Sequence, residues 1–165
     1  SGNISSWEMD SICFYHGEHE LARVNKTKYG ISDFADIVSE DVDRHFTKNG
    51  VKIPIMKISR IMGTVLSKNK NKGSIALLTE DGVVDVKFRL EHFALFDKQV
   101  SEIQGNGEKK ITDKSWFGRG SKIIVTGYRR GDGFVCKKYS DTAGHSLYKI
   151  EEIQDNGDIL IRHER

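Results

Sequence analysis

The side chains best suited to binding a ligand in this chain are cations gathered at two expected turns. At the first turn they alternate with serine and asparagine in residues 67–73, a segment without an apolar side chain: Lys68, Lys70 and Lys72. At the second turn, and on the strand that returns from it, they are Arg129, Arg130, Lys137 and Lys138. A lysine or arginine that neutralises a backbone phosphate releases counterions, which makes binding depend on salt. The two clusters therefore predict phosphate binding, although lysines also serve to keep edge strands soluble.

Aromatic side chains beside the second cluster suggest how the bases of a nucleic acid are held. Tyr128 precedes the arginines and Phe134 lies beyond the turn. An aromatic ring stacked on a base contributes about 1–3 kcal/mol. Core packing is the alternative for both rings, and it is the stronger alternative for Phe134. Two further cations on expected strands, Arg60 and Lys87, complete the predicted nucleic-acid-binding set. The other aromatic residues considered are expected in the core: Phe88, Phe93, Phe96, Trp116 and Phe117.

Other kinds of chemistry find little support in the sequence. His16 and His19, together with Glu18 and Glu20, invite a metal site, but the histidines are three positions apart around Gly17. Metal sites on one helix usually take ligands at i and i+4 and need a third ligand. Neither a Gly-x-Ser-x-Gly motif nor a P-loop is present. No metal, no cofactor and no catalytic residue are therefore expected.

Composition limits the class of protein. The chain has 165 residues, with 37% hydrophobic and 30% charged residues, which is typical of one globular domain or of a small domain with an appended segment. No apolar run approaches the roughly 20 residues that span a bilayer, so a cytoplasmic location without a membrane partner is expected. Cys13 and Cys136 lie far apart and are expected to be reduced thiols. The leading Ser1 and Gly2 are typical of a cleaved tag, which predicts a piece of a longer protein.

Charge is distributed unevenly along the chain. Residues 1–50 carry 5 Lys/Arg and 9 Asp/Glu, whereas residues 51–165 carry 21 and 15. The basic part is also the part with a β pattern, as expected if it faces phosphates.

Alternating apolar residues and turn signals predict a mainly β (α+β) fold, a five-stranded OB-fold barrel over residues 53–165. The expected strands cover residues 55–66, 74–79, 83–88, 121–128 and 134–139, with a plugging helix at 90–100 and a C-terminal hairpin of 147–153 and 159–162. Gly63, in the middle of the first strand, suggests a bend or bulge. Residues 3–52 are expected to form a helical linker segment, with helices at 7–22 and 31–38 and a loop at 39–50. A second loop is expected at 104–114.

Two segments resemble bacterial replicative DNA polymerase III alpha subunits. Residues 7–21, WEMDSICFYHGEHEL, are similar to the family's E-x-E-x-LGFYLSGHPL element, with matches at Glu8, Phe14, Tyr15, His19 and Leu21. The later run IMGTVLSKNKNKGSIALLTEDGVVDVKF is similar to the opening of that family's OB-fold. The resemblance covers residues 7 to 153. Glu20 stands where the family has proline, and the segment after the fourth strand is longer than the family pattern.

The resemblance implies an OB-fold domain that follows the polymerase fingers and holds single-stranded template, DNA or RNA, near the polymerase. It also implies that the carboxylates for nucleotidyl transfer lie outside this chain, so that the parent is a DNA-directed DNA polymerase and the fragment is not itself an enzyme. The alternative is a protein-interaction module that docks on other replisome subunits and has little DNA affinity of its own.

Overall fold

The computed structural model describes residues 19–113, 115–137 and 145–163. The helix expected at 7–22 falls mostly outside these ranges, and its described part is α2 (His19–Leu21). Within the described residues, no helix has the length and apolar character needed to cross a bilayer.

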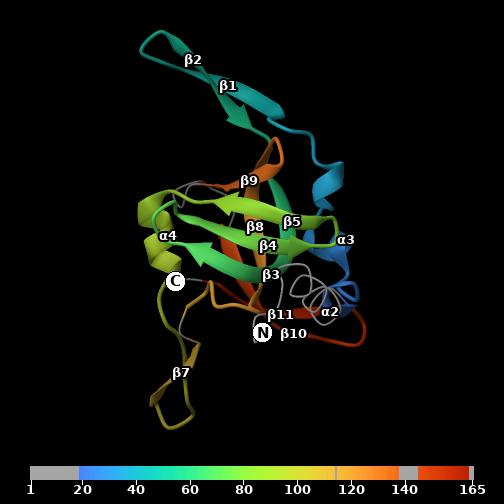
Figure 1. Cartoon of the computed structure of the whole chain (residues 1–165), viewed down its shortest axis with the longest axis vertical. Coiled ribbons are helices and arrows are strands. Elements are labelled where there is room, and N and C mark those ends of the chain that lie inside the picture. Colours follow the sequence, from blue (N-terminus) through green and yellow to red (C-terminus); the bar gives the residue numbers. More distant parts are fainter. Residues whose placement is uncertain (1–18, 114, 138–144, 164–165) are drawn as a thin grey trace, which may run out of the picture.

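Five strands close into a barrel (Figure 1). They are β3 (Ser59–Asn69), β4 (Ser74–Thr79), β5 (Gly82–Lys87), β8 (Lys122–Arg130) and β9 (Gly133–Cys136). β3, β4 and β5 form an antiparallel meander, β9 pairs with β5 in parallel, and β9 and β3 both pair with β8. This closure confirms the predicted mainly β fold and is consistent with an OB-fold.

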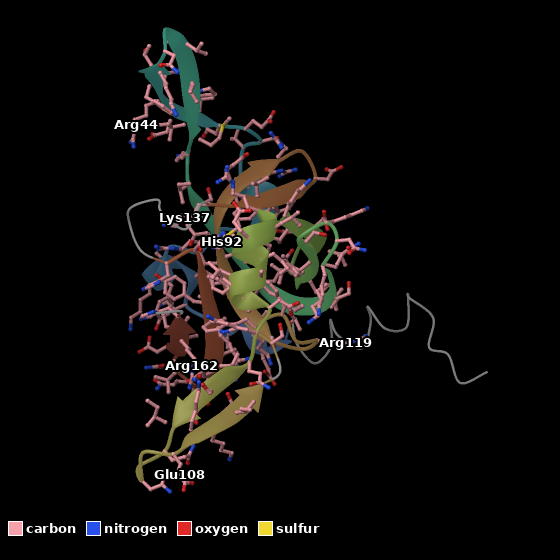
Figure 2. The ribbon with its side chains drawn as sticks, turned by 90° about the vertical axis from the view of Figure 1, so that its left-hand side faces the viewer. Arg44, His92, Glu108, Arg119, Lys137 and Arg162 are labelled. Carbon is pink, nitrogen blue, oxygen red and sulfur yellow. The ribbon has the colours of Figure 1, made fainter. Side chains whose placement is uncertain are left out.

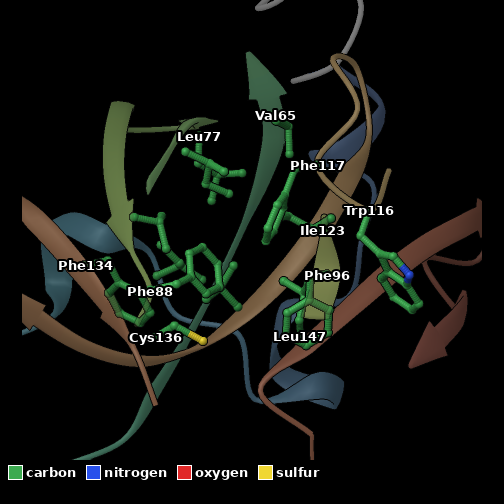
Figure 3. Packing of buried hydrophobic residues seen from close by; sticks show 14 of the residues in the cluster. Val65, Leu77, Phe88, Phe96, Trp116, Phe117, Ile123, Phe134, Cys136 and Leu147 are labelled. Carbon is green, nitrogen blue, oxygen red and sulfur yellow. The ribbon is translucent and has the colours of Figure 1, made fainter. Parts of the chain in front are cut away.

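The barrel is filled by residues that alternate along its strands (Figure 3). Val84 and Val86 of β5 point inward, whereas Asp85 and Lys87 between and beyond them are exposed. Such alternation is what a strand with one buried face requires. The aromatic residues expected in the core are all buried there: Phe88, Phe93, Phe96, Trp116 and Phe117.

Helix α4 (Leu90–Phe96) packs against this core between β5 and β8, as expected of a plugging helix, although it ends earlier than residue 100. Its buried side chains are His92, Phe93 and Phe96. The Phe93 ring stacks on Phe117, with centroids 4.9 Å apart. These rings join the helix to the segment that enters β8.

A second core forms on the outer surface of the barrel. Met62 of β3 and Ile124 of β8 point outward there and pack against apolar residues of the N-terminal segment and the last hairpin. That segment holds α3 (Lys26–Tyr29) and the 3-10 turn η2 (Phe34–Asp36), and the hairpin is β10 (Leu147–Ile153) with β11 (Ile159–His163). β10 pairs with β8 beside the barrel. The predicted C-terminal hairpin is therefore confirmed, and it extends the sheet.

Two further hairpins project from opposite ends of the molecule (Figure 1). One is β1 (Val42–Lys48) with β2 (Val51–Met56), and the other is β6 (Val100–Ile103) with β7 (Lys109–Asp113). The loops predicted at 39–50 and 104–114 are therefore wrong. The described side chains of β1 are all exposed, so the hairpin lacks the burial alternation that identifies a strand. The expected domain boundary after residue 52 falls within β2.

Gly63 is required by close packing. A Cβ at this position would lie 2.4 Å from the Leu78 carbonyl oxygen, which is far inside van der Waals contact. The irregularity in β3 lies instead between Val65 and Ser67, where the register with β4 shifts. The bulge predicted at Gly63 therefore lies two to four residues further along β3.

Candidate nucleic-acid interface

The predicted lysine loop contains an internal ion pair. Lys68 Nζ lies 2.6 Å from Asp97 Oδ1, and Lys70 Nζ lies 3.6 Å from Asp97 Oδ2. Asp97 follows α4 directly, and it also accepts a hydrogen bond from Ser115 Oγ at 2.7 Å. The Asp97 side chain is 9% exposed. Two of the three loop lysines therefore already share one carboxylate.

The electrostatics of Asp97 follow from these contacts. Burial by itself raises the pKa of the carboxyl group, because it disfavours the charged form. The hydrogen bonds from Lys68 and Ser115, and the charges of Lys68 and Lys70, outweigh burial and hold the pKa of Asp97 below its ordinary value. The carboxylate is therefore charged at neutral pH and competes with any phosphate for the same lysines.

Three of the predicted cations lie open to solvent at this end of the barrel. The Lys70 side chain is 70% exposed, and Lys72 and Lys87 are also exposed. The amide of Phe88 donates to the Gly73 carbonyl oxygen at 2.8 Å, and Lys87 pairs in register with Ser74. These contacts bring the end of β5 beside the lysine loop. Lys72 and Lys87 thus belong to one basic end of the barrel.

The register of β8, β9 and β5 brings two predicted residues onto one outer face. Tyr128 is the partner of Val135 on β9, and Val135 is in turn the partner of Lys87 on β5. Residues paired in register share a face of the sheet. Tyr128 is half-buried and Lys87 is exposed. A ring and a cation therefore stand in one row across the barrel wall.

The arginine turn is engaged by the chain's own N-terminal segment. Arg129 Nη1 donates to the carbonyl oxygens of Phe34 and Ile37 at 3.0 and 3.2 Å, and the guanidinium lies 4.3 Å from the centre of the Phe34 ring. Arg130 Nε lies 3.3 Å from Glu40 Oε1, and its side chain is 64% exposed. Arg129 therefore has a structural role, and Arg130 is the more accessible of the two.

Two other predicted residues are buried, and a third is half-buried and engaged by the chain itself. Phe134 is 1% exposed within the core, so the prediction that its ring stacks on a base is corrected in favour of core packing. Lys137 is 4% exposed. Arg60 is half-buried and donates to Thr126 Oγ1 and to the Tyr29 carbonyl oxygen, both at 3.4 Å. Lys138 lies outside the described residues.

The two cationic turns lie at opposite ends of the barrel strands. β3 and β8 are antiparallel, and Ser59 pairs with Gly127 whereas Thr64 pairs with Lys122. The end of β3 that leads to the lysine loop is thus far from the end of β8 that leads to Arg130. The outer face of β5 and β9 lies between them.

The structure also contains a third basic site, which the sequence does not predict. A shallow hollow of about 270 Å³ is lined by Arg119, Lys122 and Lys149, at the start of β8 and beside β10. Lys122 pairs with Glu20 at 3.0 Å, and Lys149 donates to Ser121 Oγ at 3.3 Å. These residues come from segments about 28 positions apart, so their proximity has no signal in the sequence.

A metal site finds no candidate in the part of the chain that the structure describes, where no three His, Cys, Asp or Glu side chains gather suitably. His16 and Glu18, which invited such a site, lie outside the described residues.

Comparison with known proteins gives two informative relatives. No protein-family model matches the chain, and no solved structure matches it. It is 38% identical over 166 residues to a probable DNA polymerase, YorL, of Bacillus subtilis (strain 168), and equally to a DNA-directed DNA polymerase of Bacillus phage SPbeta. The alignment covers 99% of this chain but 13% of each relative. The chain is thus similar over almost its whole length to one segment of proteins named DNA polymerases.

Proposed function

We propose that this chain is the OB-fold region of a DNA polymerase of the polymerase III alpha type, and that it holds single-stranded template DNA without strong sequence preference. The observation that carries the proposal is the similarity of almost the whole chain to a segment of named DNA polymerases. A barrel alone is a scaffold that supports many functions. The similarity therefore supplies the ligand class, and the surface of the barrel suggests where the ligand binds.

The basic end of the barrel is the proposed phosphate-binding surface. Lys70, Lys72 and Lys87 are exposed there and approach one another through the β4–β5 pairing. Neighbouring strands lie about 4.8 Å apart, so Lys87 and Tyr128, which are separated by β9, stand about 10 Å apart in one row. A single strand crossing the outer face can meet the lysines with its phosphates and Tyr128 with a base. Nucleotidyl transfer is assigned to other parts of the parent polymerase.

Fluorescence anisotropy with a labelled single strand, measured over a salt series, tests this proposal. Each phosphate contact contributes about 0.7 to the slope of log affinity against log salt for a single strand. Replacing Lys70 and Lys72 together by alanine should weaken binding and lower the slope by about 1.4. The matched control replaces Lys109 and Lys110 by alanine on the remote β6–β7 hairpin. Equal losses in the two variants, or binding that salt does not weaken, would contradict the proposal. An RNA strand of the same sequence compares the two nucleic acids.

Docking on another replisome subunit is a second candidate, favoured by the apolar side chains of the β6–β7 hairpin. Ile103 and Ile111 are 74% and 53% exposed. The register pairs Ser101 with Ile111, so both isoleucines lie on one face of the hairpin. Replacing both by serine should abolish capture of the chain by purified sliding clamp or clamp loader while leaving DNA binding intact. Unchanged capture would remove this candidate.

A further inference from the structure

The β1–β2 hairpin is a separate two-stranded ribbon that stands clear of the barrel (Figure 1). Its tip is the turn Asn49-Gly50, in which both residues have positive φ, 53° and 76°. That conformation is the tight hairpin turn whose twist matches the strands. An isolated ribbon of two strands is marginally stable in water. We therefore ask whether its exposed side chains bind a ligand that would stabilise it.

The base of the ribbon is anchored to the barrel. The Glu40 amide donates to the Arg129 carbonyl oxygen at 2.8 Å, and the Gly131 amide donates to Ser39 Oγ at 2.7 Å. Across the base, the Lys57 amide donates to the Asp41 carbonyl oxygen at 2.7 Å. The ribbon therefore leaves the barrel from a defined point beside the β8–β9 turn.

The ribbon is basic. Residues 42–57 contain four Lys/Arg and one Asp, a net charge of +3. The single acid, Asp43, pairs with its neighbour Arg44 at 3.3 Å. Among the described residues, no side chain pairs with Lys48 or Lys52, which flank the turn. The β6–β7 hairpin has the same architecture, but residues 100–113 carry a net charge of −1. Figure 2 shows Arg44 on the basic ribbon and Glu108 on the other hairpin, at opposite ends of the molecule.

Cations lie on both faces of the ribbon. Lys48 is paired with Val51, and Phe46 with Ile53, so these four residues share one face. Thr47 is paired with Lys52, which places Lys52 on the other face. The first face also presents apolar area, because Phe46 and Val51 are 43% and 60% exposed.

We propose that the β1–β2 ribbon binds duplex DNA by entering the major groove. This groove is about 12 Å wide and admits a two-stranded β-ribbon. The face that carries Phe46 then lies against the base edges, where thymine methyl groups offer an apolar contact. Lys48 leaves this face and Lys52 the opposite one, and both long side chains can reach the phosphates that line the walls of the groove. A partner that covered only the Phe46 face would leave Lys52 without a counter-charge. Addition of a further strand to β2 is disfavoured by Pro54, which lacks an amide hydrogen.

This inference rests on the proposed function only in taking DNA as the ligand, and it concerns a different surface and a different form of DNA. The barrel meets a single strand, and the ribbon meets a duplex. The two surfaces can therefore fail or succeed independently.

The experiment uses the whole chain with a short labelled DNA duplex and, separately, with one of its strands, over a salt series. Each phosphate contact contributes about 0.9 to the salt slope for duplex DNA. Replacing Lys48 and Lys52 by alanine should weaken duplex binding and lower its slope by about 1.8, while single-strand binding changes little. The control is again the Lys109 and Lys110 pair, on a hairpin of the same kind. All four lysines are exposed, so folding is not at risk.

The outcomes separate the two proposals. Loss of duplex binding confined to the Lys48 and Lys52 variant supports the ribbon as the duplex site. Equal loss in the control, equal loss of single-strand binding, or no duplex binding by the unaltered chain overturns it. Single-strand binding by the variant that lacks Lys70 and Lys72 tests the proposed barrel site separately. Phe46→Ser adds a second readout: it should weaken duplex binding without lowering the salt slope, and unchanged affinity would exclude the apolar contact.

Discussion

Lys68 Nζ lies 2.6 Å from Asp97 Oδ1, so the loop predicted to bind phosphate is joined to the residue that ends α4. The carboxylate occupies the position that a phosphate oxygen would take beside this lysine. Lys70 Nζ lies near the other oxygen of the same carboxylate, Asp97 Oδ2. A nucleic acid that binds the loop must therefore displace Asp97 or use the lysines that it leaves exposed.

Removing this competing anion should strengthen single-strand binding. Asp97→Asn leaves the shape of the side chain nearly unchanged but releases the charges of Lys68 and Lys70. We expect higher affinity and a salt slope that is steeper by about 0.7, one phosphate contact. Glu108→Gln, on the remote β6–β7 hairpin, removes the same charge and serves as the control in the anisotropy assay. A similar rise in both variants would mean that net charge alone is responsible.

The same substitution should alter the dependence of stability on pH. The pKa of Asp97 is lowered in the folded chain, so the ionised group stabilises the fold above its unfolded pKa of about 3.9. That contribution is lost as the pH falls through the folded pKa. Hydrogen bonds to charged groups contribute about 1.5–3 kcal/mol each, so Asp97→Asn should lower the free energy of unfolding by about 2 kcal/mol at neutral pH. Urea unfolding at neutral and strongly acidic pH measures the difference. A difference that persists unchanged in acid would refute this assignment.

Arg129 should matter for the fold more than for binding DNA. Its guanidinium joins the carbonyl oxygens of Phe34 and Ile37 to the barrel, and Arg129→Ala leaves both without that donor. We expect a loss of about 1–3 kcal/mol in unfolding free energy and faster amide hydrogen exchange at residues 34–40. Arg130→Ala breaks only an exposed pair with Glu40 and should cost less than about 1 kcal/mol. Equal effects of the two substitutions would show that Arg129 is not the anchor.

Sequence patterns locate the barrel because its strands are apolar, largely buried runs bounded by turn residues. β4 was predicted at its observed bounds, and β10 likewise, since each has a face that is buried. The loops predicted at 39–50 and 104–114 miss β1 and β7, because both strands are rich in charged residues and neither hairpin has a core to face. The turn residue pair Asn49-Gly50 is the available signal for the first hairpin.

The candidate site was less predictable than the fold. Cations in turns can be counted from sequence, but their partners cannot, because Lys68 and Asp97 are 29 positions apart and Arg129 and Phe34 are 95 apart. The strand register determines where the other predicted residues lie. It placed Tyr128 and Lys87 in one row, and it turned Phe134 into the core.

Closure of the barrel should depend on Gly127. A Cβ at this position would lie 1.9 Å from the Val135 carbonyl oxygen, where β8 meets β9. Gly127→Ala must push these strands apart, and overpacking of this kind costs about 1–3 kcal/mol. Gly105→Ala is the control, because nothing lies within 4 Å of a Cβ there. Thermal unfolding compares them, and a Gly127 variant as stable as the control would show that the strands can separate freely.

Substitution of Tyr128 should affect DNA binding, whereas substitution of Phe134 should affect stability, although the sequence predicts that both rings stack on bases. Tyr128 is half-buried on the outer face, so Tyr128→Ala should reduce single-strand affinity by about 1–3 kcal/mol, the value of one stacked base. Phe134 is 1% exposed, so Phe134→Leu should instead lower the unfolding free energy by about 0.5–3 kcal/mol. The binding of this second variant should match that of the unaltered chain wherever it is folded. Anisotropy and urea unfolding on both variants measure the two effects. If Tyr128→Ala binds normally, base stacking on this face is excluded and the lysines alone must hold the strand.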